Sequence, residues 1–111
     1  MQLEKVELSS RDGRRVGHVS PNEPVIVSIA VHTGDEPLKG GLTILFYDGH
    51  RASGVPAFDV ERMPYLRADD TYDVRVPFRS RICGRHVLVV VAGPGTAFER
   101  TRRARVHVKC R

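Results

Sequence analysis

Arginine side chains near the C-terminus are the residues of this sequence best suited to bind a ligand. Arg103, Arg105 and Lys109 fall on alternate positions, so they would share one face of a β-strand. With three arginines near the start of the neighbouring predicted strand, the basic face consists of Arg79, Arg81, Arg85, Arg103, Arg105 and Lys109. Guanidinium groups bind carboxylates and phosphates through paired hydrogen bonds, so this face predicts an acidic partner, either a neighbouring protein domain or subunit or an acidic glycan. The alternative is a solvated edge strand whose charges discourage aggregation.

Two cysteines, Cys83 and Cys110, could form a disulfide. If the last two predicted strands form a hairpin in which Val87 pairs with Val106, both valines face inward and Cys83 lies directly opposite Cys110. Opposite residues on antiparallel strands have Cβ atoms about 4.5 to 5.5 Å apart, slightly beyond the usual disulfide spacing, so a small local shift would be required. The bond would stabilise the fold by roughly 3 kcal/mol. Two unpaired thiols are the alternative.

No catalytic or metal-binding centre is indicated by the sequence. The same hairpin register places His86 opposite His107 on the outer face, but no third metal ligand is visible in the hairpin. The serines lie outside any nucleophile elbow, and the Gly93-Pro94-Gly95 turn is not followed by a helix that could complete a phosphate loop. Turn formation explains the loop aspartates more simply than calcium binding does. The sequence therefore predicts a protein that is not an enzyme and has no cofactor or metal.

Short strands separated by turn residues must position these side chains. Alternation and turn signals such as Asp48-Gly49 predict strands at residues 3–8, 24–33, 42–47, 57–62, 71–78, 85–92 and 102–110, with a short extra strand at 15–18. About seven strands in roughly 100 residues are typical of an immunoglobulin-like sandwich. We therefore expect residues 1–111 to form one all-β domain, an immunoglobulin-like antiparallel β-sandwich.

Alternation also divides the predicted strands into an inner and an outer face. The expected inner-face residues are Val25, Val27, Ile29, Val31, Leu42, Ile44, Phe46, Tyr72, Val74, Val76, Phe78, Val87, Val89, Val91, Ala104, Val106 and Val108. This assignment leaves Leu45, Leu88 and Val90 on the outer face, beside the arginines. An exposed apolar strip flanked by positive charge predicts contact with another domain or subunit.

Composition excludes several classes of protein. The formal net charge is +5, with most of the surplus after Phe78, which indicates a local basic patch. Nucleic-acid binding is not expected, because stacking aromatics are missing from the strand faces that carry the arginines and no recognition helix is apparent. The chain has no run of about 20 apolar residues, so membrane insertion is not expected. The first residues lack the pattern of an export signal, which predicts a cytoplasmic protein or a domain of a longer chain.

An ordered series of short motifs resembles the cell-adhesion-related domain of bacteria and archaea (CARDB) over roughly residues 21–108. The motifs are Asn22-Glu23-Pro24-Val25, Val31-His32-Thr33-Gly34-Asp35, Phe46-Tyr47-Asp48-Gly49, residues 66–70, Gly84-Arg85-His86-Val87 and Glu99. The sequence departs from the family pattern at Thr33, at Asp69-Asp70, at Ala92-Gly93 and in the segment after Glu99, where arginines replace acidic residues. The resemblance implies a seven-stranded immunoglobulin-like module found in surface and secreted proteins.

The first half of the chain is also similar to the carboxyl-terminal sandwich of the ATPases that export O-antigen polysaccharide. The residues concerned are 3–8, Asp12-Gly13, 22–29 and Asp48-Gly49. That family binds the end of the glycan in the cytoplasm. From the two resemblances we expect a non-catalytic adhesion, interaction or spacer module of a larger exported or cell-surface protein, with a cytoplasmic polysaccharide-binding domain as the alternative.

Overall fold

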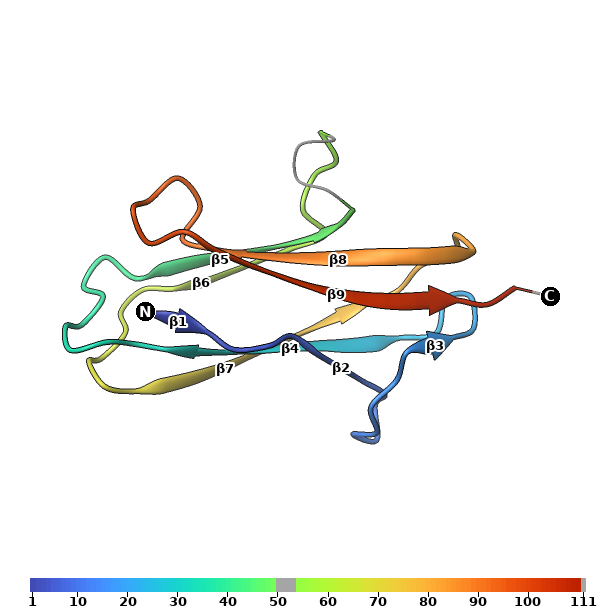
Figure 1. Ribbon diagram of the computed structural model, residues 1–111, viewed down its shortest axis with the longest axis horizontal. Coiled ribbons are helices and arrows are strands. Elements are labelled where there is room, and N and C mark those ends of the chain that lie inside the picture. The colour runs from blue at the N-terminus through green and yellow to red at the C-terminus, as the bar shows by residue number, and fades with distance from the viewer. Residues whose placement is uncertain (50–53, 111) are drawn as a thin grey trace.

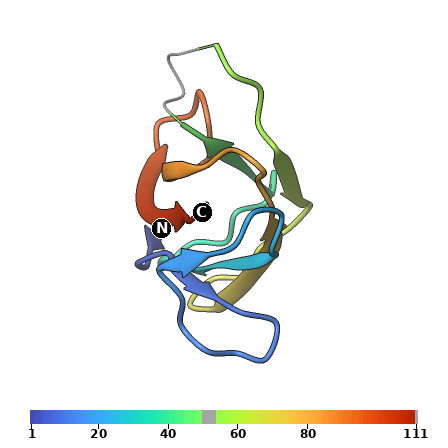
Figure 2. The same cartoon turned by 90° about the vertical axis from the view of Figure 1, so that its right-hand side faces the viewer.

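The computed structural model describes residues 1–49 and 54–110, and in these residues every regular element is a β-strand. Nine strands form two sheets, one with four strands and one with five. Viewed along the long axis of the molecule, the two sheets face each other as the layers of a β-sandwich (Figure 2). No helix long and apolar enough to cross a membrane occurs in the described residues. The predicted all-β sandwich is therefore confirmed, whereas its immunoglobulin-like topology stays a prediction.

The four-stranded sheet is built around β4 (Val25–His32). Along its whole length β4 pairs antiparallel with β7 (Thr71–Phe78). The opposite edge of β4 is shared by the short strands β1 (Gln2–Leu3) and β2 (Glu7–Ser9). The single strand predicted at residues 3–8 is thus two strands, which follow each other along one edge of the sheet (Figure 1).

The five-stranded sheet has the order β3-β9-β8-β5-β6. Its strands are β3 (His18–Val19), β9 (Arg100–Val108), β8 (Gly84–Ala92), β5 (Leu42–Asp48) and β6 (Asp59–Met63). All neighbours are antiparallel except β3 and β9, which are parallel. The short strand predicted at residues 15–18 is β3, displaced toward the C-terminus.

The chain crosses from one sheet to the other just before β3. The Val16 N–H donates to the Leu8 carbonyl oxygen at 3.1 Å, whereas the Gly17 carbonyl accepts from the His107 N–H at 2.9 Å. Two adjacent residues are therefore bonded to different sheets. This crossing ties β2 to the C-terminal half of β9.

Alternating branched side chains fill the space between the sheets. In β4 every second residue, from Val25 to Val31, is almost completely buried, and β7 supplies Val74, Val76 and Phe78 from the same sheet. The aromatic rings of Phe46, Phe58 and Phe78 pack in series, with centroid distances of 6.2 and 5.2 Å. The core is thus built mainly from branched aliphatic residues, as their abundance and alternation in the sequence predict.

The register of the last hairpin differs by one residue from the predicted one. Val87 pairs with Arg105, and His86 pairs with Val106. Because paired residues on neighbouring strands share a face, Leu88 and Val90 face the core, where they are 1% and 0% exposed, while Val87 faces outward and is 36% exposed. The predicted contact strip is therefore wrong at Leu88 and Val90. Residues 87–91 are apolar at every position, so alternation could not determine which of them point inward.

The remaining residue of the predicted strip, Leu45, lies on the outer face but packs into a small second apolar cluster. It contacts a group formed by Tyr47, Val89 and Val91, against which Ala57 also packs. Val89 and Val91 are consequently buried although they point away from the main core. The five-stranded sheet is thus apolar on both faces in its centre, which is the reason why β8 has no polar alternation.

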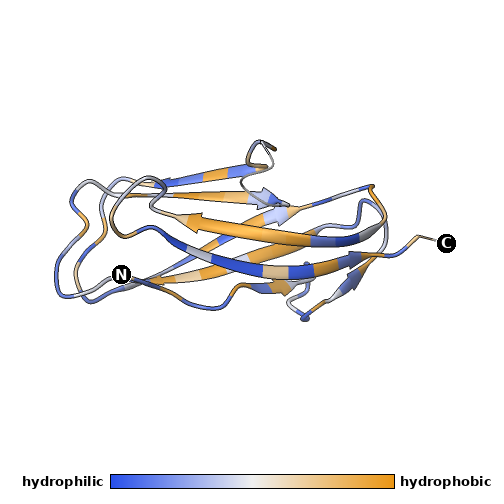
Figure 3. Cartoon of the chain, turned by 45° about the horizontal axis from the view of Figure 1, so that its top comes forward, coloured by the Kyte–Doolittle hydropathy of each residue, from blue (hydrophilic) through white to orange (hydrophobic). Residues whose placement is uncertain are grey.

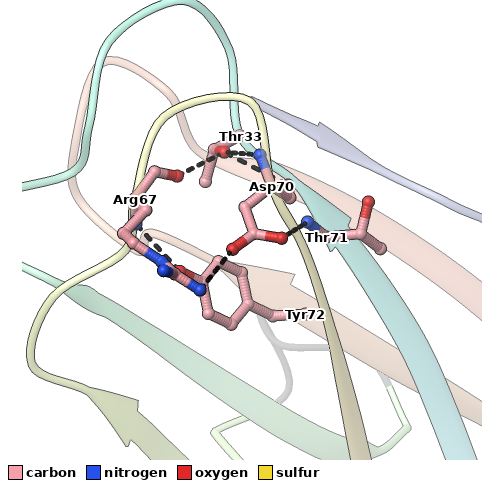
Figure 4. A network of polar contacts seen from close by, with 5 residues as sticks. All are labelled: Thr33, Arg67, Asp70, Thr71 and Tyr72. Carbon is pink, nitrogen blue, oxygen red and sulfur yellow. Dashed lines mark hydrogen bonds and ion pairs between the residues drawn. The ribbon is translucent and has the colours of Figure 1, made fainter.

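Polar contacts hold the turn before β7 against the end of β4 (Figure 4). The Thr33 hydroxyl donates to the Arg67 carbonyl at 2.6 Å and accepts from the Asp70 N–H at 2.8 Å. The Tyr72 hydroxyl accepts from the Arg67 N–H at 2.8 Å, and an Asp70 carboxylate oxygen accepts from the Thr71 N–H at 2.9 Å. Asp70 therefore has a role in building the turn, which is the role expected from the sequence.

Candidate binding groove between β2 and β9

The two cysteines lie at one end of the five-stranded sheet. They are joined as a disulfide, with Cα atoms 5.7 Å apart. In the observed ladder Gly84 pairs with Val108, so a straight continuation would bring Cys83 opposite Lys109 rather than Cys110. Gly84 has a φ of +113°, a conformation that only glycine adopts without strain. Through this residue the chain leaves the ladder, and Cys83 can reach Cys110 despite the shifted register.

His86 lies on the inner side of β8, not on the outer face beside His107 as predicted. Its Nδ1–H donates to both carboxylate oxygens of Asp48 at 2.9 Å, and its Nε2–H donates to the Ile82 carbonyl at 2.7 Å. A carboxylate and a backbone carbonyl only accept hydrogen bonds, so this arrangement of partners favours the protonated ring.

The surroundings of the His86 ring act on its pKa in opposite directions. Burial against Phe78, whose ring centroid is 5.8 Å away, favours the neutral form. The hydrogen bond to Ile82 and the charge and hydrogen bonds of Asp48 outweigh burial, so the pKa of His86 is raised above its ordinary value. His86 thus links β8, β5 and the loop that carries Cys83. Sequence alternation missed this role because it placed the ring on the wrong face.

A groove of about 750 Å³ lies between β2 and the central part of β9. Its apolar wall is formed by residues of both sheets, namely Val6, Leu8, Val16, Val87 and Ala104. Val6 and Leu8 belong to the main core, and Val16 and Ala104 pack against that core. The groove is therefore a place where the core comes close to the surface, at the open side of the sandwich.

Charged side chains surround this apolar wall. Lys5, Arg15, Arg103 and Arg105 contribute positive charge, and Glu7 contributes the one carboxylate among the residues that line the groove. Glu7 accepts a hydrogen bond from the Arg15 guanidinium at 2.9 Å, and both side chains are more than half exposed. Within residues 1–49 and 54–110, no salt bridge involves Arg103 or Arg105. Among the described residues, two guanidinium groups without an ionic partner therefore stand beside an apolar surface.

A smaller hollow of about 320 Å³ adjoins the groove at β8 and β9. Arg85, Arg103, Val87 and the His86–Asp48 pair contribute to its lining. Val87 and Arg103 line both hollows. Figure 3 shows the resulting contrast, with hydrophilic residues along β9 next to the hydrophobic centre of β8.

The structure thus divides the predicted basic face into two parts. Arg85, Arg103 and Arg105 gather around Val87. The other three predicted residues, Arg79, Arg81 and Lys109, are exposed but contribute to neither hollow.

Lys5 and Arg15 are functional candidates that the sequence reasoning missed. They lie close to β9 only because β2 occupies the open side of the sandwich. No spacing in the sequence connects these two residues with β9, so a pattern along the chain could not have identified them.

Comparisons with known proteins do not identify a family. No family model matches the chain, and no curated protein matches it. Among solved structures it is similar to a superoxide reductase (neelaredoxin) from Ignicoccus hospitalis, with 16% sequence identity, a TM-score of 0.37, and coverage of 96% of this chain and 80% of that chain. The resemblance to the cell-adhesion-related domain stays a prediction.

The comparisons correct the function expected from the sequence, because none of them supports it. They provide no support for an exported adhesion, interaction or spacer module or for a polysaccharide-binding domain. Both expectations are withdrawn. At this TM-score and identity, superoxide reduction is not assigned to this chain.

Proposed function

We propose that the groove between β2 and β9 binds an acidic segment of another protein. One observation carries the proposal: Arg103 and Arg105 lie beside an apolar wall and have no carboxylate partner among the described residues. Arginine is enriched at protein interfaces and among the residues that contribute most to binding, where it lies beside apolar surface that the partner covers. An acidic segment would neutralise them while covering Val87 and the groove wall.

The proposed role is binding without catalysis. The groove supplies fixed positive charges and apolar contact, which favour association and orientation of a partner. Arginine remains protonated at physiological pH, so Arg103 and Arg105 are suited to recognising carboxylates rather than to exchanging protons.

We also propose that the protein works in an oxidising compartment. The disulfide between Cys83 and Cys110 supports this, because such bonds persist outside the reducing cytoplasm. Alkylation and intact-mass measurement of protein from its native host, prepared without reductant, should detect no free thiol. Two alkylated cysteines would contradict the proposal.

A charge-reversal experiment tests the proposed groove. The probe is a fluorescent peptide of about ten residues, half of them glutamate and half valine, whose binding is measured by fluorescence anisotropy. In the double variant Arg103→Glu/Arg105→Glu, affinity should fall by about tenfold or more, because two charge-assisted contacts are lost and replaced by repulsion.

The control variant is Arg79→Glu/Arg81→Glu. It changes the net charge equally but alters exposed residues outside the groove. Its affinity should stay within about threefold of the parent protein. An equal loss in both variants would show non-specific attraction to a cationic protein, and absence of binding to the parent protein would exclude the proposed function.

A further inference from the structure

One edge of β9 is open along most of its length. On one side β9 pairs with β8 from Arg100 to Val108. On the other side β3 pairs only with His107 and Val108. No other strand in the described residues pairs with this edge, and the central residues of β9, Arg103 to Arg105, line the groove.

The backbone groups at this open edge can be assigned from the contacts of its closed part. The N–H groups of His107 and Lys109 donate toward the β3 side, to Gly17 and Val19, at 2.9 and 2.8 Å. Alternate residues of a strand direct their N–H and C=O groups to the same side, so those of Arg103 and Arg105 also point toward this edge. Among the described residues neither of these two residues has a hydrogen-bond partner there. Two donors and two acceptors are therefore available to a further strand.

The side chains around the edge define what such a strand would contain. Residues of an added strand that lie beside Arg103 and Arg105 on the outer face would meet two guanidinium groups, and carboxylates fit there. The intervening residues would point to the opposite side, toward Val6, Leu8 and Ala104 in the groove wall. Apolar side chains fit these positions, because they would cover the core where it approaches the surface.

We propose that the groove accepts an extended peptide strand that pairs with the free edge of β9 and alternates acidic with apolar residues. This inference rests on the proposed function and specifies the form of its partner. Main-chain hydrogen bonds to Arg103 and Arg105 provide affinity, and the alternating side chains provide specificity, as in other additions of a strand to a sheet edge.

A second copy of this protein is a poorer occupant of the edge. Two β9 strands pairing with each other would bring arginines directly opposite arginines, which is destabilising. The other open edge of the sheet, β6, carries Val60 and Arg62 on the outer face, because these residues pair with Leu45 and Thr43. Joining β6 to β9 would thus place Arg62 beside the arginines of the groove. Charge complementarity therefore favours a separate acidic strand.

The test compares three peptides of the same composition. One alternates glutamate and valine, the second places the same residues in two blocks, and the third alternates but carries N-methyl groups at every second residue, so that one edge of the peptide cannot donate hydrogen bonds. The alternating peptide should bind about tenfold or more tightly than either of the others, since they lose the side-chain match or the ladder. Anisotropy measures the affinity of each.

Amide hydrogen exchange by NMR provides a readout specific to strand pairing. The N–H groups of Arg103 and Arg105 should exchange at least about tenfold more slowly in the complex with the alternating peptide. The amides of Arg79 and Arg81 serve as controls and should not change.

The possible outcomes separate this inference from the proposed function. Equal binding of the alternating and blocked peptides, abolished by Arg103→Glu/Arg105→Glu, would retain acidic binding but overturn strand pairing. Peptide binding without slower exchange of the Arg103 and Arg105 amides would also overturn strand pairing. Displacement of the peptide by an oligouronate that binds more tightly would overturn it as well, and would assign the groove to acidic glycans. Absence of binding by all three peptides would overturn both proposals.

Discussion

Substituting valine by alanine at two positions of β8 distinguishes the observed register of the last hairpin from the one that alternation predicts. Val90 is 0% exposed and belongs to the main core, whereas Val87 is 36% exposed and borders the groove. Removing two carbons from a buried side chain loses about 1.6 kcal/mol of transfer free energy. The cavity that remains adds about 1 kcal/mol, so Val90→Ala should destabilise the protein by about 2–3 kcal/mol.

The same substitution at Val87 should cost about 1 kcal/mol or less, because this side chain is partly solvated in the folded protein. Both changes remove the same atoms from the same strand, so effects on strand propensity and on the unfolded chain largely cancel in the comparison.

Thermal unfolding followed by circular dichroism measures the difference between the two variants. At about 4 °C per kcal/mol for a chain of this size, the melting temperature should fall by about 8–12 °C for Val90→Ala and by about 4 °C or less for Val87→Ala. A larger fall for Val87→Ala would mean that Val87 faces the core. The groove would then lose its central apolar residue, and Arg103 and Arg105 would no longer share a face with it.

Three further predictions concern the contacts that hold the sheets together. The folded-state pKa of His86 is raised, so the stability that protonated His86 contributes is present below the ordinary histidine pKa and is lost as the pH rises through the folded-state pKa. His86→Gln should therefore destabilise the protein more at about pH 5 than at about pH 9, as measured by urea unfolding. A destabilisation that grows with pH would contradict the raised pKa. The disulfide joins residues 27 positions apart, so replacing Cys83 and Cys110 by serine should lower the free energy of unfolding by about 3.5 kcal/mol, as measured by unfolding in guanidinium chloride. A decrease of less than about 1 kcal/mol would show that the bond adds little constraint to the unfolded chain. Gly41 has a φ of +79°, and a Cβ there would lie 2.1 Å from a backbone oxygen, so Gly41→Ala should lower the free energy of unfolding by about 2 kcal/mol or more. A Cβ at Gly40 would meet no atom within 4 Å, so Gly40→Ala should change that free energy by about 0.5 kcal/mol or less. Similar melting temperatures for these two variants would refute the close approach of Gly41 to the backbone oxygen.

The sequence by itself determines the class of fold and the orientation of several strands. In β4 the valines and Ile29 alternate with Ser28, Ala30 and His32, so only one face of that strand can enter a core. The observed burial follows this alternation along the whole strand. Turn residues between the apolar stretches limited each strand to a short length, and together these patterns were enough to predict an all-β sandwich.

Only the tertiary structure decides which residues of β8 point inward. Residues 87–91 are apolar at every position, so shifting them by one exchanges one acceptable apolar face for another. The observed choice depends on partners distant in the chain, because Asp48 binds His86 on the inner side and Tyr47 covers Val89 on the outer side. Alternation within one strand contains no information about either partner.

The candidate site shows the same division between sequence and structure. The alternation of Arg103 and Arg105 was sufficient to place both on one exposed face of a strand. Their position at an open edge, opposite Lys5 and Arg15, depends on β2 lying across the open side of the sandwich. Periodicity along a chain specifies the faces of each strand, whereas the edges left unpaired and the grooves between strands are set by long-range pairing, which only the folded chain displays.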